Sequence, residues 1–122
     1  TGPFIQYTFA RIHSVLRKAG TKIPEIPKEY SNKISEKELS LIRYLYKFPE
    51  MVEDSAKELN PALIANHLYE VAREFNQFYH DHSILNADNE EDRNFRLNLS
   101  YSAGTVIKNG MFLLGIDVPE RM

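Results

Sequence analysis

Apolar residues recur at steps of three and four along almost the whole of this 122-residue chain. That spacing places them on one face of an α-helix. It runs through residues 3–19, 36–59, 61–82 and 90–114, and no segment of strand length alternates apolar and polar residues. The pattern predicts an all-α bundle. A chain of this length can bury one core but not two, so residues 1–122 are expected to form a single domain.

Residues that start or stop helices divide the pattern into about five helices. Ser35 and Glu38 have the spacing of a capping box, which predicts a helix start. Pro49 is expected to end that helix and begin a short one, because proline is tolerated at a first helical position. Pro24 and Pro27 are expected to keep the long connection at 21–34 extended. The other boundary signals are Gly20, the pair Asn60-Pro61, the polar stretch 83–91, and Gly115 with Pro119.

Charge and cysteine content narrow the classes of function. The formal net charge is −2, so the chain has no basic excess for sequence-blind attraction to phosphates, and any nucleic-acid contact needs a local patch. The chain has no cysteine, which excludes disulfides and thiolate metal sites and makes a cytoplasmic location the expectation. No apolar run is long enough to cross a bilayer, so a membrane is not an expected partner.

The first helix carries a strip of aromatic and basic residues beside its apolar face. At about 100° per residue, Phe4, Tyr7, Arg11 and Lys18 fall roughly a third of a turn from the face that carries Ile12. Rings and cations in such a line can stack unpaired bases and hold phosphates. The alternative is that the two rings pack against a neighbouring helix while the two cations lie at its solvated rim. Spacing alone leaves both interpretations open.

Residues 75–85 form the second candidate region. Phe75 and Phe78 fit the core face of a helix, and Tyr79 lies at its edge. His80 and His82 are two residues apart, so on a helix they point in nearly opposite directions and do not form one metal site. No metal ligand set is therefore predicted.

The remaining signals do not indicate an enzyme. His67 lies in an apolar stripe and is expected to be a hydrogen-bonded, half-buried histidine, whereas His13 is expected to be exposed. The acidic run 90–92 suits the positive end of a helix. The chain contains no glycine-rich phosphate loop and no defensible serine–histidine–acid arrangement.

Five segments in this order resemble the C-terminal, DALR-type anticodon-binding domain of arginyl-tRNA synthetase, a class I aminoacyl-tRNA synthetase. The resemblance covers nearly the whole chain. The segments are QYTFARIHSVLRK (6–18), LIRYLYKFPEMVEDSAKEL (41–59), LIANHLYEVAREFNQFY (63–79, after Pro61), RLNLSYSAGTVIKNGMFLLGI (96–116) and PERM (119–122).

The resemblance implies a domain that grips the anticodon loop of arginine tRNA and reads its central cytosine. ATP-dependent arginylation, with its ATP and magnesium, would belong to a catalytic domain of the same protein. The class I signatures are absent from these residues, so the chain is expected to be a catalytically silent piece with no cofactor of its own.

Family positions add roles for individual residues. Phe4, Tyr7 and Arg11 correspond to positions that face the loop, Tyr79 resembles a tyrosine that stacks on a base, and the backbone of Met122 is implied to lie at the anticodon. Two departures are that Phe4 stands where a tyrosine is common and that Ser83 stands where some relatives have an aromatic residue. The predicted tRNA-binding residues are Phe4, Tyr7, Arg11, Lys18, Tyr79 and Met122.

Two other functions fit parts of the sequence. A helical protein-interaction module would use the aromatic strip to dock a partner helix, and its binding would be insensitive to salt and tRNA. The related domain of another class I synthetase, such as the cysteine enzyme, is disfavoured by the closing PERM.

Overall fold

The computed structural model describes residues 2–20, 22–26 and 28–122, and it confirms the all-α class. Within those residues the chain forms four helices and no strand. The helices are α1 (Gly2–Ala19), α2 (Glu36–Glu58), α3 (Ala62–Asp81) and α4 (Glu90–Leu113).

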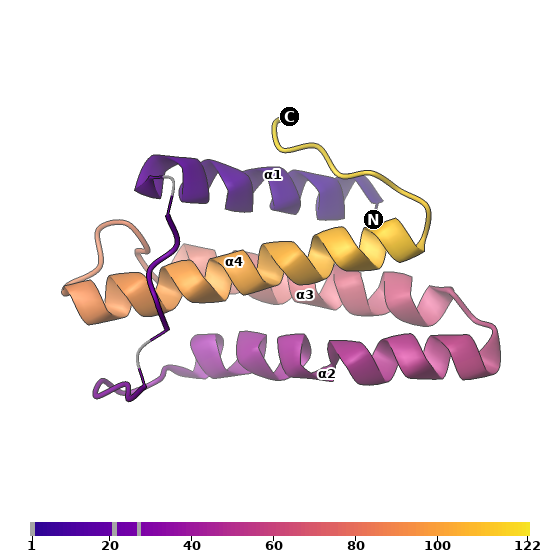
Figure 1. Cartoon of the computed structure of the whole chain (residues 1–122), viewed down its shortest axis with the longest axis horizontal. Helices are drawn as coiled ribbons and strands as arrows, with labels where there is room; N and C mark the ends of the chain where they lie inside the picture. The colour runs from indigo at the N-terminus through magenta and orange to yellow at the C-terminus, as the bar shows by residue number, and fades with distance from the viewer. Residues whose placement is uncertain (1, 21, 27) are drawn as a thin grey trace.

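The helices form a bundle in which successive helices run in opposite directions (Figure 1). α3 and α4 lie between α1 at one edge and α2 at the other, and each outer helix packs on both inner ones. The segment between α1 and α2 therefore crosses one end of the bundle. After α4 the C-terminal tail turns back and runs over α1 (Figure 1).

The expectation that Pro49 separates two helices is wrong, because α2 continues through it. Proline removes the N–H that would bond to the carbonyl of Leu45, at a cost of about 3 kcal/mol within a helix. Phe48 and Val52, on either side of Pro49, both pack against the core. A continuous helix places residues four apart on the same face, so both side chains reach the core, and this burial offsets the missing bond. The bundle thus has four helices rather than about five.

The capping box at Ser35 and the glycines predicted to end two helices are confirmed. Ser35 accepts a hydrogen bond from the Glu38 amide at 3.1 Å, and the Glu38 carboxylate accepts one from the Ser35 amide at 2.9 Å. Gly20 (φ 114°) and Gly115 (φ 77°) take the left-handed conformation that ends α1 and α4.

Side chains from all four helices fill the core, with Phe9, Leu41, Phe75, Phe78 and Ile107 among the most deeply buried. The expectation that Leu113 also faces the core is wrong, because it is 53% exposed. At about 100° per residue it lies roughly a third of a turn from the face that carries Ile107 and the buried Met111. Along the described ranges, no helix is long and apolar enough to cross a membrane.

The expectation that His67 is hydrogen-bonded is confirmed, since its Nε2 lies 2.8 Å from the Tyr44 carbonyl oxygen. That distance makes Nε2 a donor to the carbonyl, because a carbonyl oxygen can only accept. The residue is more deeply buried than expected, at 6% exposed. Burial lowers the pKa of His67 below its ordinary value, and the bond to Tyr44 opposes this effect only in part.

This shift predicts a loss of stability in mild acid. Below about pH 6.5 the unfolded chain binds a proton at His67 more readily than the folded chain, so the free energy of unfolding falls as the pH falls. Urea unfolding between pH 7.5 and pH 5.5 measures the slope. His67→Gln keeps a donor for Tyr44 without a titrating ring and should flatten it, whereas an unchanged slope would contradict the assignment.

The connection between α1 and α2 is tied to the start of α4. The Tyr30 ring stacks on Phe95 with centroids 4.4 Å apart, and its hydroxyl donates to Asp92. This bond lowers the pKa of Asp92 and, together with burial, raises that of Tyr30. The Ser31 hydroxyl donates to Glu91 at 2.8 Å. The acidic residues that begin α4 therefore also anchor the connection; Pro27, expected to keep it extended, lies outside the described residues.

Candidate nucleic-acid interface

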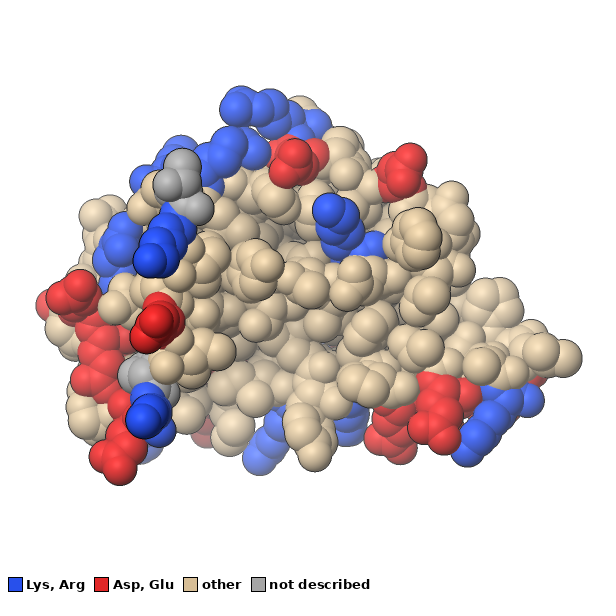
Figure 2. Space-filling view, viewed as in Figure 1, with Lys and Arg blue, Asp and Glu red and all other residues tan. Residues whose placement is uncertain are grey.

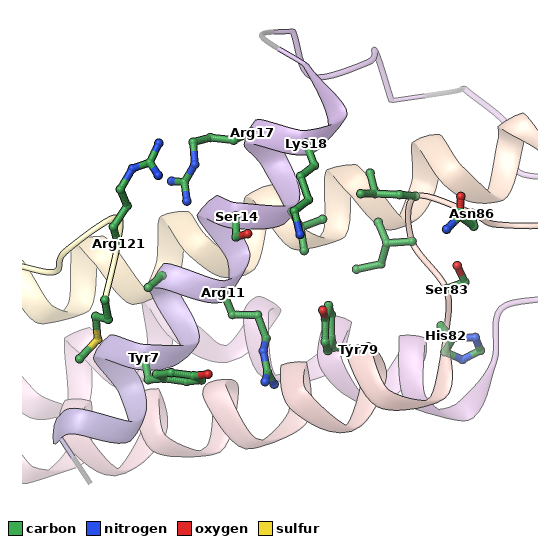
Figure 3. A pocket seen from close by; sticks show the side chains of 15 residues that line it. Tyr7, Arg11, Ser14, Arg17, Lys18, Tyr79, His82, Ser83, Asn86 and Arg121 are labelled. Atoms are coloured by element: carbon green, nitrogen blue, oxygen red, sulfur yellow. The ribbon is translucent and has the colours of Figure 1, made fainter.

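A groove of about 700 Å³ runs between α1, the end of α3 and the C-terminal tail. α1 contributes one wall, and the segment after α3 contributes the other (Figure 3). Five of the six predicted site residues line it: Tyr7, Arg11, Lys18, Tyr79 and Met122.

The centre of the groove is a stack of two tyrosines and an arginine. The guanidinium carbon of Arg11 lies 4.7 Å from the ring centroid of Tyr79 and 5.6 Å from that of Tyr7 (Figure 3). Both rings remain accessible, with Tyr7 53% and Tyr79 39% exposed. α1 and α3 therefore place three flat groups next to each other on an open surface, an arrangement suited to stacking further flat groups.

The groove is positively charged although the chain is not. Four cationic side chains line it, and no aspartate or glutamate is among its lining residues. Figure 2 shows lysine and arginine atoms gathered along the edge formed by α1 and the tail. This is the local patch that a chain of net charge −2 needs in order to bind phosphates. The four cations are Arg11, Arg17, Lys18 and Arg121.

Three side chains of α1 hold the tail in place. Gln6 donates to the Asp117 carbonyl oxygen at 3.4 Å, and Arg17 donates to the Glu120 carbonyl oxygen at 3.1 Å. His13 Nδ1 lies 3.0 Å from a Glu120 carboxylate oxygen. These contacts bring Met122, which is 69% exposed, to the edge of the groove.

The expectation that His13 is simply exposed is wrong. Its side chain is 28% exposed, its ring packs on Phe9 with centroids 4.5 Å apart, and it contacts Glu120. Burial lowers the pKa of His13, and the charge of Glu120 opposes the shift. The sequence offered no signal for this role, because Glu120 reaches His13 only when the tail folds back along α1.

Phe4 does not join the other five residues. Its ring packs on Tyr69 with centroids 5.5 Å apart and lines a separate, shallow hollow with Arg73 and His80. The alternative interpretation, packing against a neighbouring helix, therefore describes Phe4, which keeps 37% of its surface exposed. Helical spacing placed Phe4 and Tyr7 on one strip, but Phe4 packs on Tyr69 of α3 whereas Tyr7 lies beside Arg11 in the groove.

The segment after α3 closes the other side of the groove. Ser83 and Asn86 line the groove, and the Arg96 guanidinium donates to the Ser83 carbonyl oxygen at 2.8 Å. His82 also lines the groove, whereas His80 lines the hollow beside Phe4, so the two histidines face different sites as their spacing predicts. Within the described ranges, no three potential ligand side chains gather to hold a metal ion.

Sequence reasoning missed several lining residues. Ser14 follows Arg11 by three residues and lies on the same side of α1 as the predicted Lys18, so helical spacing could have identified it. Arg17 and Arg121 meet at the rim only because the tail returns over α1 (Figure 3). Asn86 belongs to an irregular segment, whose side-chain directions follow no period.

An all-α bundle with an open, cationic and aromatic groove has the surface features that single-stranded nucleic-acid binders use. The comparison with protein families identifies the family. Residues 5–122 match the model of the DALR anticodon binding domain, and the chain belongs to this family.

Similar proteins are arginine–tRNA ligases. Those of Parabacteroides distasonis and Phocaeicola vulgatus are each 52% identical to this chain over its full length. The arginyl-tRNA synthetase of Thermus thermophilus, a solved structure, matches the whole chain with a TM-score of 0.87 and 35% identity. The chain spans about a fifth of each relative: 21%, 20% and 21% of their lengths, respectively.

Proposed function

We propose that this chain binds the anticodon loop of arginine tRNA and supports arginylation by a catalytic region of a longer arginine–tRNA ligase. The observation that carries the proposal is the accessible Tyr7–Arg11–Tyr79 stack. Bases splayed out of the loop would extend this stack, and Arg17, Lys18 and Arg121 would hold the phosphates at the rim.

Membership of an anticodon-binding family supports the choice of tRNA over other single-stranded nucleic acids. The names of the relatives support arginine tRNA. The position of Met122 at the groove edge supports a contact between the tail and the loop. ATP and magnesium would act in the catalytic region, at a site outside these residues.

The proposal is tested by titrating the chain with the arginine anticodon stem-loop and following fluorescence anisotropy. Tyr79→Ala should weaken binding about tenfold, near 1.4 kcal/mol, which is in the lower part of the range for one stacked base. The loss is modest because Arg11 already covers part of the Tyr79 ring. A stem-loop with its central cytosine replaced should also bind more weakly.

Tyr46→Ala is the matched control, because Tyr46 is 85% exposed on α2, at the opposite edge of the bundle from α1. It should bind the stem-loop like the unchanged chain. Equal affinities for the Tyr79 and Tyr46 variants would contradict the proposal. Affinity that changes neither with salt concentration nor with replacement of the central cytosine would instead favour a protein-interaction module. Phe112, which is 74% exposed, is a candidate contact for such a module.

A further inference from the structure

The Arg11 guanidinium is held by a side chain outside the groove. Its Nη1 donates to Oδ1 of Asn76, which lies on α3. Asn76 lines the shallow hollow beside Phe4 rather than the groove. It therefore contacts Arg11 from the side away from any groove ligand. An arginine side chain has several rotatable bonds, so a fixed partner limits the positions its planar head can take.

The hydrogen bonds around Asn76 determine which way its amide points. Its Nδ2 donates at 2.8 Å both to Thr8 Oγ1 and to the Ala72 carbonyl oxygen. The Thr8 hydroxyl donates its proton to the Phe4 carbonyl oxygen at 2.9 Å, so towards Asn76 its oxygen can only accept. The amide nitrogen must therefore face Thr8 and Ala72, and the amide oxygen must face Arg11.

This network lies where it has little freedom to rearrange. Thr8 and Ala72 are fully buried, at 0% exposure. Turning the amide over would set its oxygen against the Ala72 carbonyl and its nitrogen against the Arg11 guanidinium. Both contacts would be repulsive in a poorly solvated place.

We propose that Asn76, oriented by Thr8, is a positioning residue that fixes the Arg11 guanidinium between Tyr7 and Tyr79 for RNA binding. The inference rests on the proposed function, because any effect of Asn76 on RNA passes through Arg11. The network preorganises the three-membered stack, so a ligand does not have to order the arginine when it binds.

A double-mutant cycle tests the proposal with the arginine anticodon stem-loop as the probe. Arg11→Ala should weaken binding about tenfold, and Asn76→Ala about fivefold. The double variant should bind no more weakly than Arg11→Ala alone. If Asn76 affected only the stability of the fold, Asn76→Ala would weaken RNA binding by the same factor whether position 11 is arginine or alanine. That result would overturn the proposal. Gln77→Ala is the control, since the Gln77 amide bonds to Lys37 at 3.0 Å, away from the groove.

A second measurement needs no RNA. In the free chain, NMR of the arginine side chains should show slowed rotation of the Arg11 guanidinium, and Asn76→Ala should restore fast rotation. Asn76→Ser replaces Asn76→Ala in both experiments if thermal unfolding shows that the alanine variant does not fold. Unchanged rotation in the variant would overturn the positioning role. Wild-type RNA affinity in Arg11→Ala would instead contradict the proposed function, while the NMR result still decides whether Asn76 holds Arg11.

Discussion

Arg96→Met is expected to lower the free energy of unfolding by about 3 kcal/mol, because it leaves a buried carboxylate without its counter-charge. Glu38 is 1% exposed, and its Oε2 lies 3.1 Å from Arg96 Nε. The other oxygen of Glu38 accepts from the Ser35 amide, so the carboxylate cannot turn towards water without breaking the cap of α2. Urea unfolding at pH 7.5 measures the loss.

Two further variants test whether the loss of stability comes from the buried charge of Glu38 or only from the loss of an ion pair. Lys57→Met breaks an exposed pair with Glu53 and should leave the unfolding midpoint almost unchanged. Adding Glu38→Gln to Arg96→Met removes the orphaned charge and should recover part of the stability. If Arg96→Met and Lys57→Met were equally mild, the Glu38–Arg96 pair would have no special role in the core.

Arg96 also bonds to the Ser83 carbonyl oxygen, so its loss should affect the groove as well as the core. The segment that carries Ser83 and Asn86 lines the groove opposite α1. We therefore expect Arg96→Met to weaken binding of the anticodon stem-loop even at temperatures where the chain remains folded. Lys57 lies on α2, at the edge of the bundle opposite α1, and does not line the groove, so its variant should bind normally.

Gly110→Ala is expected to lower the free energy of unfolding by about 2 kcal/mol through overpacking. A Cβ atom at this position would lie 2.6 Å from both methyl carbons of Leu68 and 2.9 Å from its Cγ. Leu68 is 0% exposed, so it can move away only by repacking against other core side chains. The higher helix propensity of alanine returns about 1 kcal/mol, which does not offset the clash. Thermal or urea unfolding measures the net loss.

Gly104 provides the comparison within the same helix. A Cβ atom there would meet a single side-chain atom, Ile12 Cγ2, at 3.1 Å, so Gly104→Ala should cost less than Gly110→Ala. In a double-mutant cycle, Leu68→Ala removes the atoms that clash at position 110. The double variant should then be more stable than the sum of the two single losses predicts. Simple additivity would contradict the packing argument.

Helix positions and core faces could be predicted well from the sequence. The period of three to four residues places Ile12, Phe75 and Phe78 inward, and all three are buried. The capping box at Ser35 and the glycines after α1 and α4 also act as predicted. These features depend on groups within a few residues of each other, so the chain encodes them locally. Pro49 is different, because its effect depended on how Phe48 and Val52 pack against other helices.

The candidate site was predicted only in part. Tyr7, Arg11 and Lys18 share one strip by spacing, and the family resemblance added Tyr79 and Met122; all five line the groove. Phe4 satisfied the same spacing but packs on Tyr69. Whether a residue of the strip lines the groove depends on which side chains of other segments pack beside it. The sequence pattern of a single helix carries no information about those neighbours.

By itself, the sequence determined that this chain is a helical domain, which side of each helix is buried, and which family it resembles. Those properties follow from the backbone period and from the order of short segments. Only the tertiary structure decided that Asn76 holds Arg11, that the tail brings Arg121 beside Arg17, and that Phe4 lies apart. The physical reason is that each of these contacts joins residues from different helices or from the tail, at distances in the sequence that no local pattern spans.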